Sequence, residues 1–378
     1  MVMEIYLDNG ATTKVCPEAA EAAMNAMTVT YGNPSSTHTK GREAKAILDK
    51  ARGQVAAALG AKSEEIIFTS CGSESDNWAL LRGAEARKYV GKHIISSAAE
   101  HDAIRKTLEY MEQQGYEVTL LKPGREGMIT PEQLRETLRS DTALVSLMLV
   151  NNETGAVTDI PAMREVLAEA NSQALLHTDA VQGFLKIPFS AKTLSADMIS
   201  LSGHKIHAPK GIGALYIRSG VHIQPYIMGG GQENGLRSGT EALPQIAAFG
   251  AAAEVGAKEA AEAQKRMAAL RQHCIDSVLT RSPDAVVIGG GAPHILCLSL
   301  PGYRSEVLMN FLEAQGIYVS KGSACKRGKR SHVLEAMGIP VKIIDGAIRV
   351  SLSRFTTEEE INAFVAGLIE AKARLRSR

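Results

Sequence analysis

Apolar runs and helical patterns alternate along the chain from about Pro17 to Ile217. "GREAKAILDKARGQVAAALG" has apolar residues at helical spacing and ends at Gly60, a residue suited to closing a helix. The same alternation predicts strands at "EEIIFTS", "KHIISSA", "EVTLL", "ALVSLMLV", "ALLHTD", "MISLS" and "IGALYI", and helices at "ESDNWALLRGAEARKYV" and "HDAIRKTLEYMEQQG". Short apolar strands between helices are typical of a mostly parallel central sheet flanked by helices, so we expect an α/β fold.

The last third of the chain has a different pattern. From Leu243 to about Leu279 it is alanine-rich and lacks proline after Pro244, which predicts one long helix or a closely spaced pair. Further strand and helix patterns follow, and Thr356 and Glu359 have capping-box spacing before the final helix. We place the domain boundary inside this long helical stretch and expect a large domain over residues 15–255. Residues 1–14 and 256–378 would form a smaller α+β domain.

Charge and cysteine content exclude several classes of protein. Among 378 residues, 42 Lys and Arg balance 41 Asp and Glu to a net charge of +1, so no global field favours nucleic acid or a membrane surface. The cysteines are odd in number, far apart and without a C-x-x-C pair: Cys16, Cys71, Cys274, Cys297 and Cys325. This argues against a disulfide framework and a structural zinc site. With no secretory signal and no apolar run long enough for a bilayer, we expect a cytoplasmic protein without a membrane partner.

Lys205 and Asp179 each follow a predicted strand. Alone, Lys205 would be a solvated loop lysine, and Asp179 would be a helix cap. Ligands of open α/β sheets, however, bind at the carboxyl ends of strands. A pyridoxal phosphate (PLP) site needs a lysine for a Schiff base and a carboxylate that keeps the pyridine nitrogen protonated. The two residues on successive strand ends fit those roles.

The stretch "FTSCGSESDN" predicts a place for a phosphate group. A strand leads through Cys71, Gly72 and Ser73 into a helix opening with Glu74, and backbone amides at a helix N-terminus bind anions. By itself the stretch is only a good cap, with Ser73 as a capping residue. Neither a convincing G-x-G-x-x-G after a strand nor a P-loop is present, so the sequence disfavours nicotinamide and nucleotide cofactors.

Ten motifs now resemble one family in their order along the chain: "YLDNGATT", "YGNPSSTH", "FTSCGSESDN", "EHDA", "NNETG", "HTDAVQ", "SGHKIHAPKGIGALY", "GGGQENGLRSGT", "GSAC" and "IRVSL". They are similar to those of cysteine desulfurases, in the class V aminotransferase branch of PLP fold-type I enzymes. The resemblance runs from Ile5 to the last helix. It is closest to the NifS- and IscS-type group, whose cysteine loop carries "GSAC".

The resemblance implies a role for each matching residue around the cofactor. Lys205 would be the Schiff-base lysine, Asp179 would face the pyridine nitrogen, Gln182 the ring hydroxyl, and His101 would stack on the ring and shuttle protons. The phosphate would be held by Gly72, Ser73, Ser202 and His204, and by Thr240 from the partner subunit of a homodimer.

The resemblance also implies how the substrate L-cysteine is bound. Asn152 would contact the cofactor or the substrate amine, and Asn33 and Arg349 the carboxylate. Cys325 would take the sulfur as a persulfide, leaving L-alanine, and pass it to an acceptor protein for iron–sulfur cluster or thio-cofactor assembly. No metal is implied.

The segment around Cys325 favours a reactive thiolate, because Lys321, Lys326 and Arg327 would lower its pKa. Its "KRGKR" run is more basic than the family pattern, which suggests either an acidic acceptor protein or discrimination against the family's usual scaffold protein. In both cases, charge reversal at Lys329 and Arg330 would change sulfur transfer to an acceptor. A nucleic-acid partner is not expected, because this basic patch is small and lacks aromatic residues.

Other interpretations remain open from sequence. A selenocysteine lyase would share the fold and cofactor and release selenium from L-selenocysteine. A PLP-free protein- or RNA-binding module would use the basic loop alone. Individually, His101 could be a helix cap, Arg349 a paired strand arginine and Asn33 a turn residue.

Overall fold

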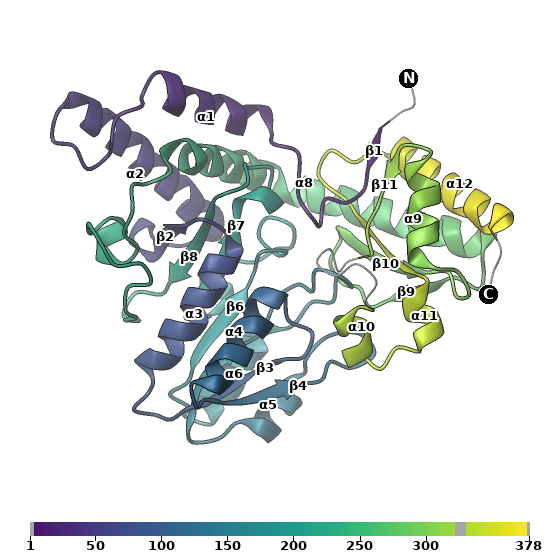
Figure 1. The fold of residues 1–378 in the computed structure, drawn as a ribbon, viewed down its shortest axis with the longest axis horizontal. Helices are drawn as coiled ribbons and strands as arrows, with labels where there is room; N and C mark the ends of the chain where they lie inside the picture. Colours follow the sequence, from purple (N-terminus) through teal and green to yellow (C-terminus); the bar gives the residue numbers. More distant parts are fainter. Residues whose placement is uncertain (1–3, 322–329, 376–378) are drawn as a thin grey trace.

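A seven-stranded sheet forms the centre of the larger part of the molecule (Figure 1). The computed structural model describes residues 4–321 and 330–375, so Cys325 lies outside the described residues. The strands are β2 (Ile66–Thr69), β3 (His93–Ser97), β4 (Glu117–Leu121), β5 (Thr142–Ser146), β6 (Leu175–Asp179), β7 (Met198–Ser202) and β8 (Gly213–Ile217), in the order β2-β8-β7-β6-β5-β3-β4. Only β8 runs against its neighbours, β2 and β7, which confirms the mostly parallel sheet.

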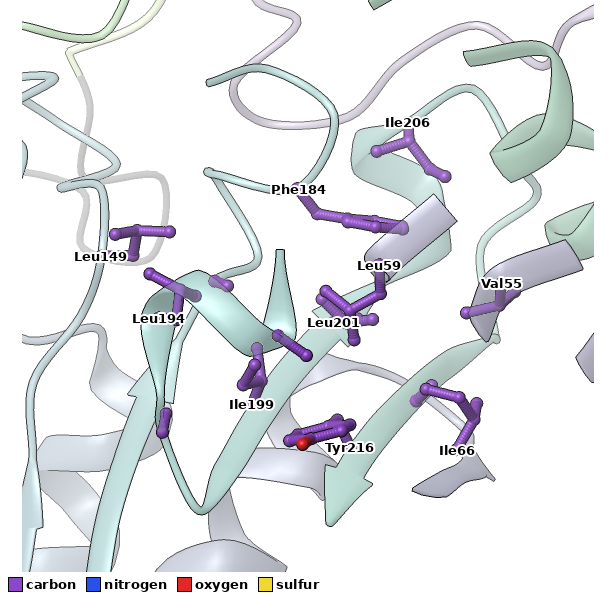
Figure 2. Close-up of a cluster of buried hydrophobic side chains, with 14 of the residues drawn as sticks. Val55, Leu59, Ile66, Leu149, Phe184, Leu194, Ile199, Leu201, Ile206 and Tyr216 are labelled. Carbon is purple, nitrogen blue, oxygen red and sulfur yellow. The ribbon is translucent and has the colours of Figure 1, made fainter. Parts of the chain in front are cut away.

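Helices cover both faces of this sheet. The helices before the long α8 are α1 (Pro17–Thr28), α2 (Thr39–Leu59), α3 (Gly72–Ala86), α4 (Asp102–Gln113), α5 (Pro131–Thr137), α6 (Ile160–Glu169) and α7 (Ala191–Leu194). One face packs against α1, α2, α5, α6 and α8, and Figure 2 shows part of that core around Ile66, Ile199 and Tyr216. The other face, with Ile67 and Met198, packs against α3 and α4. Alternate strand residues thus enter different cores, which explains the near-continuous apolar runs.

A single helix, α8 (Leu243–Arg281), joins the two parts of the molecule (Figure 1). Its first half packs on the sheet core, and its second half packs on a separate core with β10 and α12. Around that second core lie β1 (Ile5–Tyr6), β9 (Val286–Ile288), β10 (Ile295–Ser299), α9 (Ser305–Glu313), β11 (Ile317–Tyr318), α10 (His332–Ala336), α11 (Val341–Asp345), β12 (Ala347–Ser351) and α12 (Glu358–Arg374). The prediction of one long helix is confirmed. The domain boundary at residue 255 stays a prediction, and it falls within α8.

Three local predictions are wrong in detail. The capping box of α12 is formed by Thr357 and Glu360, one residue later than expected, because Thr356 instead accepts a hydrogen bond from the Ser353 amide. Helix α3 begins at Gly72 rather than Glu74, so Ser73 lies inside its first turn and is not the cap. The apolar run 143–150 is strand only as far as residue 146.

Gly60 closes α2 as predicted, in the left-handed region at φ 69°. Replacing it by alanine is expected to destabilise the protein by about 1 kcal/mol or more, because φ is unfavourable and the new Cβ would lie 2.9 Å from Ser190 Cβ. The matched control is Gly53→Ala within the same helix, where the nearest atom to a new Cβ is 3.9 Å away. The free energy of unfolding of that variant should rise by roughly 0.5–1 kcal/mol, because alanine favours a helix more than glycine does. In thermal denaturation, the melting temperature should therefore fall in Gly60→Ala and rise in Gly53→Ala. Equal shifts of the melting temperature in the two variants would contradict this interpretation.

Candidate active site

A cavity of about 290 Å³ opens at the carboxyl edge of the parallel strands, where ligands of open α/β sheets bind. Most of the predicted site residues line it: Gly72, Ser73, His101, Asn152, Asp179, Gln182, Ser202, His204, Lys205 and Arg349. The cavity is also lined by residues that the sequence interpretation did not assign, among them Gly10, Cys71, Asp76 and Glu153. The fold thus brings together residues that are up to 339 positions apart in sequence, from Gly10 to Arg349.

Lys205 lies directly after β7, in the short turn Gly203–Lys205. Its Nζ donates hydrogen bonds of 2.7 Å to the carbonyl oxygens of Gly10 and Ala11. Burial, followed by the positive charge of Arg349, lowers the pKa of Lys205 to about 8. A buried lysine amine with a depressed pKa is suited to act as a nucleophile or a base near neutral pH.

Asp179 ends β6, beside the strand that leads to Lys205. Its Oδ1 accepts a 2.9 Å hydrogen bond from the Val181 amide. The helix-cap alternative for Asp179 is wrong, because a turn follows β6 and the next helix, α7, is capped by Ser190. Burial raises the pKa of Asp179, while His101, the Val181 amide and Lys205 act in the opposite direction. The carboxyl group also lines the cavity, so its contact with the Val181 amide leaves it available to a ligand.

His101 is the N-cap of α4, where its Nδ1 accepts a 3.1 Å hydrogen bond from the Ala103 amide. The capping alternative and the cavity position are therefore both correct. Because the Nδ1 lone pair is used, the proton of the neutral ring belongs on Nε2. The ring is thus held in one tautomer at the wall of the cavity.

Anion-binding groups gather at the start of α3. The side chain of its N-cap, Cys71, accepts no hydrogen bond from the helix. The backbone N–H groups of the first turn therefore have no capping partner and remain available to an anion in the cavity. Ser202 Oγ, at the end of β7, is buried and has no hydrogen-bond partner among the described residues. A Cβ on Gly72 would lie 2.8 Å from Val181 Cγ2, which explains why glycine stands at this close approach. An unsatisfied hydroxyl beside free amides is suited to a phosphate.

His204 lies at the same end of the cavity, next to the Lys205 turn. Its Nδ1 and Thr12 Oγ1 are 3.2 Å apart. Burial, followed by the charge of Lys205, lowers the pKa of His204 to about 4, so the ring is neutral at neutral pH. It can therefore offer a hydrogen bond to an anion but no charge.

Arg349 forms a second polar end of the cavity. It lies on β12 and is 2% exposed. Its guanidinium donates hydrogen bonds of 2.7 Å to the Asn152 carbonyl oxygen and to Asp8 Oδ1. The pairing that the strand-arginine alternative foresaw is present, and it fixes the guanidinium in the cavity wall, where a small carboxylate can meet its planar fork.

The residues that flank the undescribed segment 322–329 are fixed to this site. Before it, Ser320 pairs through its backbone with Arg349, and Lys321 forms an ion pair with Glu306. After it, Arg330 pairs with Asp345, and Ser331 Oγ donates a 2.5 Å hydrogen bond to buried Glu153. Two of the cations that the sequence interpretation assigned to this basic segment therefore have acidic partners.

Two predicted site residues do not line the cavity. Asn33 is exposed in the connection between α1 and α2, where its Oδ1 accepts a hydrogen bond from the Ser35 amide, as a turn residue does. Thr240 is also exposed, before α8. Their assigned roles stay predictions, and that of Cys325 lies outside the described residues.

The sequence interpretation missed several buried ionisable groups. Asp76, Glu100 and Glu153 are 1%, 1% and 3% exposed, and Lys186 is 7% exposed. Burial, followed by the charge of Lys205, lowers the pKa of Lys186 to about 7. A signal was present for three of them, because Asp76, Glu100 and Glu153 lie within motifs quoted for the family resemblance.

Neither a metal cluster nor a membrane span is found in the part of the chain that the structure describes. Within residues 4–321 and 330–375, no three His, Cys, Asp or Glu side chains are arranged to hold a metal ion. No helix in the same ranges is both long and apolar enough to cross a membrane.

Comparisons with known proteins agree with this geometry. The family described as Aminotransferase class-V matches residues 5–364. A cysteine desulfurase of Trichormus azollae is 44% identical over 99% of this chain and 94% of its own length. The cysteine desulfurase IscS of Escherichia coli O139:H28 is 41% identical over 100% of this chain and 94% of its own. A solved structure described as a NifS-like protein is 40% identical, with a TM-score of 0.93 over 99% of this chain and 100% of that one. The chain therefore belongs to the class V aminotransferase family, in the group that contains the cysteine desulfurases of the IscS and NifS type.

Proposed function

We propose that this chain is a PLP-dependent cysteine desulfurase, which converts L-cysteine to L-alanine and transfers the sulfur to Cys325 as a persulfide. The observation that carries the proposal is the presence of Lys205, Asp179 and the start of α3 in one cavity. A desulfurase assignment of the relatives at 41–44% identity supports the same reaction.

The residues of the cavity fit PLP. Asp179 would face the pyridine nitrogen, Gln182 the ring hydroxyl, and His101 the ring face. The phosphate would lie against Gly72, Ser73, Ser202 and His204, where the unpartnered Ser202 Oγ and the first-turn amides of α3 supply donors. When bound, PLP supplies an electron sink that makes the α-proton of an amino acid acidic.

The chain's own residues would perform the remaining chemistry. The guanidinium of Arg349 and the side chain of Asn152 would hold the cysteine carboxylate and amine. Lys205 Nζ would take the α-proton, and Cys325 Sγ would bond to the substrate sulfur as the C–S bond breaks. Cβ takes up one proton and Cα regains its own, so alanine leaves and one thiol becomes a persulfide.

The direct test measures products from the PLP-loaded chain. With L-cysteine and a thiol reductant, alanine and sulfide should form in equal amounts. Without reductant, one sulfur atom per chain should remain, and peptide mass spectrometry after alkylation should find it on Cys325. Alanine formation without sulfur bound to the chain would contradict the proposal.

Cofactor capture should depend on pH through Lys205. Only the neutral amine can attack an aldehyde, and a pKa of about 8 makes roughly half of Lys205 neutral at pH 8. The rate at which cofactor-free chain binds PLP, followed by absorbance, should therefore rise with pH and level off above about pH 8. If the rate still rises steeply towards pH 10, Lys205 has an ordinary pKa.

We further propose a homodimer and an acceptor protein. Thr240 is exposed and does not line its own chain's cavity, which is compatible with a contact to the partner's phosphate. Exposed Met24, Met27, Val29 and Tyr31 supply apolar surface near the end of α1. Because Arg330 already pairs with Asp345, the acidic acceptor would be recognised by Lys326, Arg327 and Lys329.

A further inference from the structure

Three buried carboxyl groups interact at or beside the cavity: Asp76 and Asp179 line it, and Glu100 acts on Asp76 from behind the lining. Asp76, Glu100 and Asp179 are 1%, 1% and 5% exposed. Asp76 lies on α3, and its Oδ1 is 3.8 Å from His177 Nε2 on β6. His177 and Asp179 are two residues apart on β6, so their side chains point to the same face of the sheet, towards α3. Asp76 therefore packs against the face that carries Asp179.

Asp179 has groups that support its negative charge. The Val181 amide donates to Oδ1, and Lys205 and His101 act on it from the neighbouring walls of the cavity. Asp76 has less support, because its Oδ1 has no hydrogen-bond partner among the described residues and the Ser200 hydroxyl is the one group that acts to lower its pKa. The pKa of Asp76 is raised well above its ordinary range by burial and then by Asp179.

The nearest basic group to Asp76 does not supply a positive charge. His177 is fully buried, and its two ring nitrogens are each 2.9 Å from a serine hydroxyl, Ser146 Oγ and Ser200 Oγ. Burial lowers the pKa of His177 to about 3, so the ring is neutral. The titratable groups that act on Asp76 or Asp179 are Cys71 before α3, Glu100 and His101 after β3, and Lys205 after β7. The two basic groups in this set, His101 and Lys205, act on Asp179 and not on Asp76.

Glu100 shares the same dry region but is held differently. Its Oε1 accepts a 2.9 Å hydrogen bond from the Met148 amide, while its Oε2 has no partner among the described residues. Adjacent carboxyl groups that water does not reach cannot all ionise. The proton belongs first on the group with the least support, which is Asp76.

We propose that Asp76 is a neutral carboxylic acid and a positioning residue for Asp179, so that Asp179 carries the negative charge at the cavity floor. The consequence for the cofactor rests on the proposed function, because a single ionised carboxylate there keeps a pyridine nitrogen protonated. The protonation of Asp76 itself follows from its surroundings and does not depend on the reaction.

Infrared spectroscopy of the PLP-loaded protein at neutral pH tests the protonation directly. A protonated carboxylic acid has a C=O stretch that an ionised carboxylate lacks. The difference spectrum between wild type and Asp76→Asn should show the loss of one such band, and Glu100→Gln serves as the matched control for assigning it. If Asp76→Asn removes only carboxylate bands, Asp76 is ionised and the proposal is wrong.

A second readout tests the positioning role. Asn keeps the shape and neutrality of a protonated Asp, so the pH midpoint of the bound cofactor's absorbance should stay within about 0.3 units in Asp76→Asn. Asp76→Ala removes the side chain that packs against Asp179 and should shift that midpoint or weaken PLP binding. A shift of one unit or more in Asp76→Asn would overturn the proposal. If the chain binds PLP but makes no alanine, the proposed function fails while both readouts remain interpretable.

Discussion

Replacing Lys205 by alanine is expected to lower kcat/KM for L-cysteine by at least about a thousandfold, or roughly 4 kcal/mol of transition-state stabilisation. The side chain is the only lysine amine that lines the cavity beside Asp179 among the described residues, and it follows β7 directly. In the proposed function, its loss would remove both the amine that captures the cofactor and the base that takes the α-proton. The measurement is initial alanine release at several L-cysteine concentrations, together with the absorbance of bound PLP.

Lys210→Ala is the matched control, because Lys210 is exposed five residues later in the same loop. It should retain normal turnover and cofactor absorbance. Lys205→Arg keeps the positive charge but cannot capture an aldehyde, so it separates charge from chemistry. Alanine release within tenfold of wild type in Lys205→Ala would contradict the assignment of this lysine.

The sheet could be predicted because its signals are local. Every strand of the sheet except the edge strand β4 buries both faces, so strands such as Leu175–Asp179 and Met198–Ser202 appear as short, mainly apolar stretches between helical patterns. The reversed direction of β8 could not be predicted, because "IGALYI" has the same pattern whichever way the strand runs. The capping box of α12 was predicted one position too early for a similar reason, because the adjacent residues Thr356 and Thr357 offer equivalent hydroxyl groups.

The candidate site was predictable where a residue type is unusual for its place. A lysine and an aspartate at successive strand ends indicated Lys205 and Asp179, and the family resemblance supplied the rest of the cavity. Asp76 lies in a motif of that resemblance, but its residue type did not indicate burial, because a polar residue in an amphipathic helix normally faces water. Only the packing of α3 on β6 shows that this side chain is buried beside His177. The ion pair between Lys321 and Glu306 could not be predicted from the sequence either, because only the tertiary structure brings the two side chains together.

Replacing Cys325 by alanine is expected to abolish sulfur transfer while leaving cofactor binding intact. When L-cysteine becomes L-alanine, the electrons of the C–S bond stay on carbon, so the sulfur has to be transferred to a nucleophile. A thiolate is the nucleophile suited to form an S–S bond. Alanine release from L-cysteine should therefore fall by at least about a thousandfold, or roughly 4 kcal/mol. The change in absorbance when L-cysteine binds should persist, because Lys205 and Arg349 remain.

Cys71→Ala is the matched control for Cys325→Ala, because Cys71 is a half-exposed free thiol that lines the cavity, whereas Cys16, Cys274 and Cys297 are buried. It should retain turnover and still yield a persulfide on Cys325. If Cys71→Ala alone loses the persulfide, the acceptor thiol lies at the start of α3. L-Selenocysteine discriminates further, because selenol leaves more readily and its release need not require Cys325. An enzyme that consumes only L-selenocysteine, with or without Cys325, would be a lyase, and the thiol would then have no part in bond cleavage.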